Sequence, residues 1–178
     1  MEQNCKSYPR KILYWILNIP MIIIYLLIAL LLWNVNLTTF IVYLSFFVIV
    51  AFAQAYVCDY WQCPYVGKFA PCVGGFCLPS SRIAILFRNA KKTKELYTII
   101  ALIAFAAFLG IFFLPVYFIY LYCVTYFVLY VAVLIAYGVL FLRFICPVCC
   151  TNKVCPGGKF ALKLKKWSSL AEIFFHSY

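Results

Sequence analysis

Three long apolar stretches constrain this chain more than any other feature of its sequence. They cover residues 11–33, 39–57 and 96–145. A helix rises about 1.5 Å per residue and the hydrocarbon core of a bilayer is about 30 Å thick, so each of the first two stretches predicts one membrane span. The third stretch is too long for one span and must fold back on itself, which predicts two more.

The turn within the third stretch is expected near Pro115. Leu114 precedes this proline and Gly110 lies close by, and a residue before proline tends to leave the helical region. The predicted fold is therefore all-α and membrane-integral, with four transmembrane helices in two hairpins, 11–57 and 96–145. The chain is 68% hydrophobic and 11% charged, far more apolar than a water-soluble domain.

The segments outside the hairpins are short. We expect an N-terminal tail over 1–10, cysteine-rich loops over 58–95 and 146–158, and an amphipathic interfacial tail over 159–178. In that last tail Phe160, Leu164 and Trp167 share one helical face, while most lysines fall elsewhere on the wheel. This face can lie on the lipid surface or dock onto a partner subunit.

Charge predicts the orientation of the spans. The 15 Lys and Arg residues fall before the first span, between the second and third, and at or after the end of the fourth, while the two expected turns carry none. The positive-inside rule then places both termini and the central loop in the cytoplasm of a multi-pass protein of the cell membrane. The net charge of +11 has this topological explanation first, with an acidic partner as the alternative.

Eight of the ten cysteines form two groups on this expected cytoplasmic side. Because cytosolic reductants keep thiols reduced, clustered cysteines there indicate metal ligands or redox-active thiols rather than a disulfide framework. Four thiolates can hold a [4Fe–4S] cluster, which we favour, or a tetrahedral zinc ion. The candidate ligands are Cys58, Cys63, Cys72 and Cys77 in the first loop, and Cys146, Cys149, Cys150 and Cys155 in the second.

Basic residues accompany both groups of cysteines. An iron–sulfur cluster on four thiolates is anionic, so neighbouring cations would offset its charge and raise its potential. The candidates for this cofactor-binding role are Lys68, Arg82, Lys153 and Lys159.

The two loops also resemble each other. Residues 58–70 align with residues 150–161 as Cys-x4-Cys-Pro followed by Gly-Lys-Phe-Ala, if one residue is deleted after the proline. The chain therefore looks like a duplicated unit, a helical hairpin followed by a cysteine loop. Such a duplication predicts two hairpins related by an axis along the membrane normal.

A family resemblance follows from these paired motifs. Cys58, Cys63 and Pro64, together with Cys150, Cys155 and Pro156, resemble the cytoplasmic cysteine motifs of membrane-bound polyferredoxins of the NapH and NosR kind. Four residues separate the paired cysteines here, where that family typically has three. The resemblance implies an integral-membrane subunit that passes electrons between the quinol pool and iron–sulfur centres.

Several functions lack the residues that they need. His176 is the single histidine and the methionines are Met1 and Met21, so no haem is expected within the spans. No span has an acidic or basic residue near its middle, which disfavours a pump. The sequence also has no nucleotide-binding Gly-rich loop and no zinc-protease helix, so we expect no enzyme active on its own.

The favoured function is a small membrane subunit that transfers electrons through iron–sulfur clusters within an oxidoreductase complex. Its expected partners are the lipid bilayer, other membrane subunits and an acidic soluble electron carrier, with no nucleic acid. Two alternatives stay open: a structural, zinc-stapled scaffold or assembly subunit, and a quinone-linked thiol–disulfide oxidoreductase. Charge disfavours the last, because such enzymes act on the oxidising face of the membrane.

Overall fold

The computed structural model describes residues 8–88, 92–152, 155 and 157–164, without the side chain of Cys77. Within these residues all the regular structure is helical, and four helices are long and apolar enough to cross a membrane. These are α1 (Lys11–Val35), α2 (Leu37–Tyr60), α4 (Lys94–Tyr122) and α5 (Val124–Phe144). The prediction of four long apolar helices is therefore confirmed.

Shorter helices occupy the segments between and after the spans. The segment between α2 and α4, which we call the central segment, contains η1 (Val73–Gly75), α3 (Cys77–Ile83) and η2 (Ala84–Phe87). A further short helix, η3 (Cys146–Val148), follows α5. Residues 157–164 are also helical, with Ala161 buried and Phe160 and Leu164 exposed. This is the start of the predicted amphipathic tail, and residues 165–178 lie outside the described part of the chain.

The first hairpin turns at Asn36, inside the expected turn. Asn36 has extended backbone (φ −161°), and its side-chain oxygen accepts a hydrogen bond from the backbone N–H of Thr38 at 2.8 Å. This bond satisfies one of the free N–H groups at the start of α2. A single residue is therefore enough to end one span and cap the next.

The second hairpin turns at Cys123, so the predicted turn at Pro115 is wrong. Pro115 lies inside α4, where Ala107, Ile111, Pro115 and Ile119 form one continuous buried stripe. A proline costs a transmembrane helix one backbone hydrogen bond, which neighbouring helices can compensate. A turn at Pro115 would instead divide the buried stripe, so packing decides against it. Cys123, expected within the fourth span, occupies the turn.

The two turns have similar backbones. Cys123 is extended like Asn36 (φ −166°), and in each turn the N–H bonds to the carbonyl four residues earlier. The two cysteine loops begin differently, because Cys58 lies within α2 whereas Cys150 lies beyond η3. The duplication of hairpin and loop stays a prediction.

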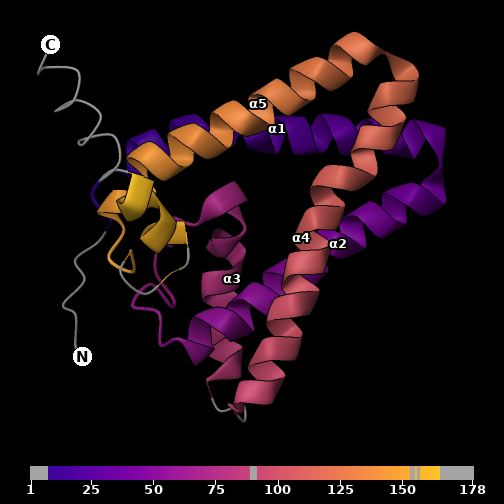
Figure 1. The fold of residues 1–178 in the computed structure, drawn as a ribbon. Helices are drawn as coiled ribbons and strands as arrows, with labels where there is room; N and C mark the ends of the chain where they lie inside the picture. The colour runs from indigo at the N-terminus through magenta and orange to yellow at the C-terminus, as the bar shows by residue number, and fades with distance from the viewer. Residues whose placement is uncertain (1–7, 89–91, 153–154, 156, 165–178) are drawn as a thin grey trace, which may run out of the picture.

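The spans form two arms with the central segment between them (Figure 1). One arm contains α2 and α4, which pack along each other, and the other contains α1 and α5. The arms meet near the hairpin turns and diverge toward the opposite end, where α3 lies between them. The buried residues form one hydrophobic cluster that includes members from all four spans and from the central segment.

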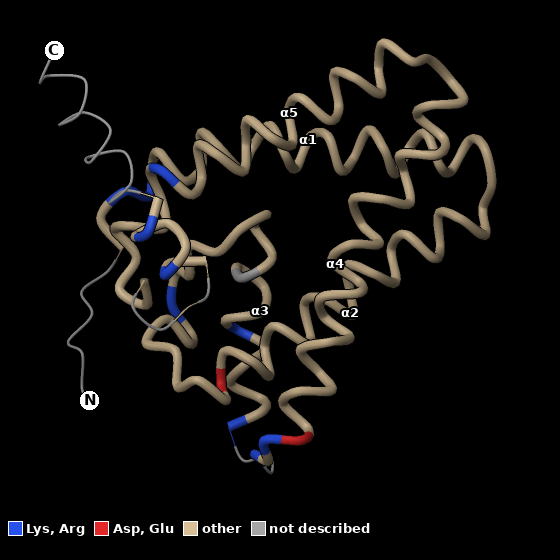
Figure 2. Tube along the Cα trace, in the orientation of Figure 1, with Lys and Arg blue, Asp and Glu red and all other residues tan. Residues whose placement is uncertain are grey.

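Basic residues gather at the end of the arms opposite the hairpin turns (Figure 2). At this cation-rich end the start of α1 is tied to the end of α5: Arg10 Nη1 donates to the Phe144 carbonyl at 3.1 Å, and Tyr8 Oη donates to the Ile145 carbonyl at 3.3 Å. A cation at a helix C-terminus also complements the helix dipole. The side of the membrane that this end faces stays a prediction.

Candidate functional site

The first cysteine pair lies at the C-terminus of α2, at the cation-rich end. The helix ends in a Schellman motif: the N–H of Cys63 bonds to the Cys58 carbonyl at 2.9 Å, and the N–H of Gln62 bonds to the Asp59 carbonyl at 3.1 Å. Gln62 takes the left-handed conformation that this motif requires (φ 48°), and Pro64 follows it. A Schellman motif brings the side chains of these two positions together, so the Cys-x4-Cys-Pro spacing produces a sulfur pair.

The two sulfurs of this pair interact directly. Cys58 and Cys63 are free and half-buried. The Cys58 thiol donates a hydrogen bond to the Cys63 sulfur, which lowers the pKa of Cys63 to about 7; burial opposes this shift and a backbone hydrogen bond from Tyr65 reinforces it. Because the thiolate is the reactive form of cysteine, this shift favours Cys63 as the nucleophile of the pair.

The second cysteine loop contacts the first through Tyr65. The backbone N–H of Cys150 donates to Tyr65 Oη at 3.2 Å, and Cys149 Sγ lies 3.1 Å from Thr151 Oγ1. Tyr65 is 4% exposed, and this burial raises the pKa of its phenol, while the bond from Cys150 opposes the shift. The phenol therefore stays protonated near neutral pH and joins the two loops.

The remaining candidate ligands have varied environments. Cys146 is buried and Cys155 is exposed, and both are free. Cys72 and Cys150 are disulfide-bonded, which differs from the expectation that all these cysteines are reduced. A sulfur in a disulfide is not a thiolate ligand. The side chain of Cys77 and the whole of Cys5 lie outside the described residues.

The expected metal centre stays a prediction. Across residues 8–88, 92–152, 155 and 157–164, no three His, Cys, Asp or Glu side chains are grouped so as to hold a metal ion. The basic candidates Lys68, Arg82 and Lys159 are exposed on the surface, and Lys153 lies outside the described residues. The geometry shows one pair of free cysteines, Cys58 and Cys63, and a second loop that is joined to the first by the hydrogen bond between Cys150 and Tyr65.

An ion pair fixes the helix end that carries this pair. Lys92 Nζ lies 2.9 Å from Asp59 Oδ2, and the side chain of Asp59 is 11% exposed. The contact joins the last turn of α2 to the residues before α4. Sequence reasoning missed both this ion pair and Tyr65, because neither has a distinctive spacing and Tyr65 is one of 15 tyrosines.

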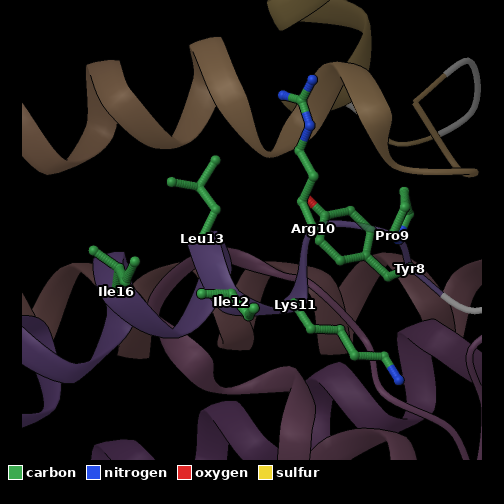
Figure 3. Close-up of a pocket in the computed structure, with 7 residues that line it drawn as sticks. All are labelled: Tyr8, Pro9, Arg10, Lys11, Ile12, Leu13 and Ile16. Atoms are coloured by element: carbon green, nitrogen blue, oxygen red, sulfur yellow. The ribbon is translucent and has the colours of Figure 1, made fainter.

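A shallow groove lies beside the first turn of α1, at the same end of the molecule (Figure 3). Its lining residues are Tyr8, Pro9, Arg10, Lys11, Ile12, Leu13 and Ile16. Arg10 points toward α5, whereas Lys11 points away from it and lies 5.9 Å from the centre of the Phe69 ring. No cysteine lines the groove, so it is separate from the cysteine pair.

Comparisons of the chain with protein-family models, with curated proteins and with solved structures found no match.

Proposed function

We propose that this chain is a membrane-spanning thiol–disulfide redox protein whose exchanging pair is Cys58 and Cys63. The observation that carries the proposal is the Schellman motif, which brings the side chains of two free cysteines together at the end of α2. One of the pair is a nucleophile near neutral pH and the other is placed to resolve a mixed disulfide.

The substrate class is a protein disulfide at the membrane surface. The Cys63 thiolate attacks one substrate sulfur, so that a mixed disulfide forms, the substrate S–S bond breaks, and the released sulfur takes a proton from water. Cys58 then loses its proton and attacks Cys63 Sγ, which forms the Cys58–Cys63 disulfide and releases the second substrate thiol. Two electrons and two protons pass to the substrate, and a soluble dithiol protein restores the pair by the reverse exchange.

The expected orientation decides the direction of this exchange. If the cation-rich end faces the cytosol, thiol reductants keep the pair in its dithiol form. The chain would then act as a reductant of disulfides, not as the oxidant that the sequence analysis disfavoured on that side.

A redox titration of the purified protein in nanodiscs tests the proposal. Samples are equilibrated in mixtures of reduced and oxidised dithiothreitol, alkylated, and mapped by peptide mass spectrometry. We expect a Cys58–Cys63 disulfide that forms and is reduced reversibly, that is lost in Cys63→Ser, and that is unchanged in the control Cys123→Ser at the distant hairpin turn. Failure of the wild-type pair to oxidise under any of these mixtures would contradict the proposal.

Iron–sulfur electron transfer is a second candidate function. The contact between Tyr65 and Cys150 favours it, because this contact draws the two cysteine loops together. Anaerobic purification, followed by measurement of iron, acid-labile sulfide and zinc, separates the candidates. Stoichiometric iron with a visible absorption that bleaches on reduction would support the cluster and overturn the dithiol proposal. Stoichiometric zinc would support a structural zinc site. The absence of both iron and zinc would exclude both metal functions.

A further inference from the structure

The central segment begins at the cation-rich end of the molecule. The Phe69 ring lies 5.0 Å from that of Tyr14, and Lys11 Nζ lies 5.9 Å from the centre of the same ring. Tyr14 and Lys11 belong to the first turn of α1. Phe69 therefore lies beside the first turn of α1, at the depth where the spans begin.

Seven residues later the same segment lies deep between the arms. The Phe76 ring contacts those of Tyr25 on α1, Phe47 on α2 and Phe108 on α4, at centroid distances of 5.9, 5.5 and 6.2 Å. At about 1.5 Å per residue, each of these three partners lies about 20 Å along its helix from the cation-rich end. Contacts with three different helices thus give the same depth for Phe76.

The segment then returns to the end from which it came. The Phe87 ring lies 6.0 Å from that of Tyr56, which is about 6 Å along α2 from the cation-rich end. The hydrocarbon core of a bilayer is about 30 Å thick, and its midplane lies about 15 Å below either surface. The contacts therefore run from shallow to midplane depth and back to shallow.

A residue of α5 accepts a hydrogen bond from the backbone N–H of Gly74 at the deep turn. The N–H of Gly74 donates to Tyr137 Oη at 2.7 Å, Tyr137 Oη donates to Asn18 Oδ1 at 2.9 Å, and Asn18 Nδ2 donates to the Tyr14 carbonyl at 2.8 Å. We call Asn18, Tyr137 and Gly74 the Asn18 latch. Asn18 is fully buried, and Gly74 needs its left-handed backbone (φ 73°) to make the turn.

The returning helix satisfies its own polar groups. Ser80 Oγ donates to the Phe76 carbonyl at 2.8 Å and Ser81 Oγ donates to the Lys68 carbonyl at 2.9 Å, and both serines are buried. Irregular backbone occurs at membrane depth only where protein buries it or where it lines a water-filled cavity. Gly74 and Phe76 are buried at the deep turn, so this part of the segment meets the first condition.

We propose that residues 71–87 form a re-entrant segment, which enters the bilayer from the cation-rich face, turns at Gly74 and Gly75 near the midplane, and is held there by the Asn18 latch. The segment fills the space between the two diverging arms. Its closing residues also support the cysteine pair, because the Ser81 carbonyl accepts a hydrogen bond from the N–H of Gly67 at 2.8 Å, in the loop that follows Cys63.

Hydroxyl-radical footprinting of the wild-type protein in nanodiscs tests the depth of the segment. Val73 is 36% exposed and Leu86 is 78% exposed in the protein without lipid, so exposure alone predicts about a twofold difference in oxidation. We expect Val73 to be oxidised at least about tenfold less than Leu86, after each is normalised to the unfolded chain, because lipid covers the deep turn. A difference of about twofold would overturn the proposal.

Amide exchange tests the latch. Tyr137→Phe removes the acceptor of the Gly74 N–H, and Asn18→Leu removes the acceptor that orients the Tyr137 hydroxyl. Exchange of the peptide containing Gly74 should accelerate about tenfold, as expected for losing one buried hydrogen bond. Asn34→Leu is the matched control, because exposed Asn34 makes the same bond to the carbonyl four residues earlier, at 3.0 Å. Unchanged exchange in both latch variants would refute the latch. The cysteine pair is intact in every variant, so failure of the proposed redox function would not affect these results.

Discussion

Replacing Cys58 with alanine should change the reactivity of Cys63 in a way that depends on pH. The wild-type Cys63 has a pKa lowered from 9.0 to about 7 by the hydrogen bond from Cys58, so about half of it is thiolate at neutral pH. Without that donor only burial and the weaker backbone bond act on the thiol, and its pKa should return to about 9 or above. About 1% would then be thiolate at neutral pH.

Nucleophilicity changes in the opposite direction, and this sets the net magnitude. A thiolate gains reactivity as its pKa rises, with a Brønsted slope of about 0.4–0.5, so two pKa units make it roughly sixfold to tenfold more reactive. The fifty-fold loss of thiolate therefore becomes about a fivefold to eightfold slower reaction at neutral pH. Above about pH 9 the variant should be the faster protein, and the two pH–rate profiles should cross near about pH 8.

The assay is the rate of iodoacetamide labelling at Cys63, followed by peptide mass spectrometry from about pH 6 to 10, with the exposed Cys155 as a reference in each sample. Cys58→Ser keeps a hydroxyl donor and should retain the wild-type profile within about twofold. If Cys58→Ala and the wild type share one midpoint, the hydrogen bond does not activate Cys63 and the reasoning is wrong.

The same shift makes a contribution to stability that depends on pH. Because the pKa of Cys63 is lower in the folded than in the unfolded protein, the contribution is complete above about pH 9 and is lost as the pH falls through about 7.

Three further predictions concern stability and are measured by thermal unfolding in detergent. Gly67 and Gly74 have the same left-handed φ of 73°, but a Cβ on Gly74 would lie 2.6 Å from a ring carbon of Phe76. Gly74→Ala should therefore cost about 2–4 kcal/mol of stability, and Gly67→Ala about 1 kcal/mol. Equal costs for the two variants would contradict this crowding. Tyr65→Phe leaves the backbone N–H of Cys150 without its acceptor and should cost about 1–2 kcal/mol of stability. Amide exchange in the second cysteine loop should also become faster. Lys92→Met leaves the Asp59 carboxylate without its partner and should lower the melting temperature. An unchanged melting temperature would show that this ion pair does not stabilise the fold.

Some features of the site follow from local sequence, although the sequence analysis interpreted them differently. The Cys58–Cys63 contact depends on five consecutive peptide units and a proline, so it is a local property of a helix C-terminus. Sequence reasoning interpreted the same spacing as ligand geometry, because metal ligation and helix capping both bring two cysteines together. The backbone conformation of Gln62, which separates the two interpretations, is a structural observation.

The sequence by itself determined the four long apolar helices, a first turn between residues 33 and 39, and the gathering of cations at one end. These depend on the transfer of whole segments between water and lipid, which adds over about 20 residues and is insensitive to packing. Only the tertiary structure decided that the second turn lies at Cys123, that Tyr65 joins the two loops, and that Phe76 lies between three spans. Each of these depends on a few contacts between residues far apart in the chain, where one buried stripe or one hydrogen bond outweighs the local preference of a proline or a loop.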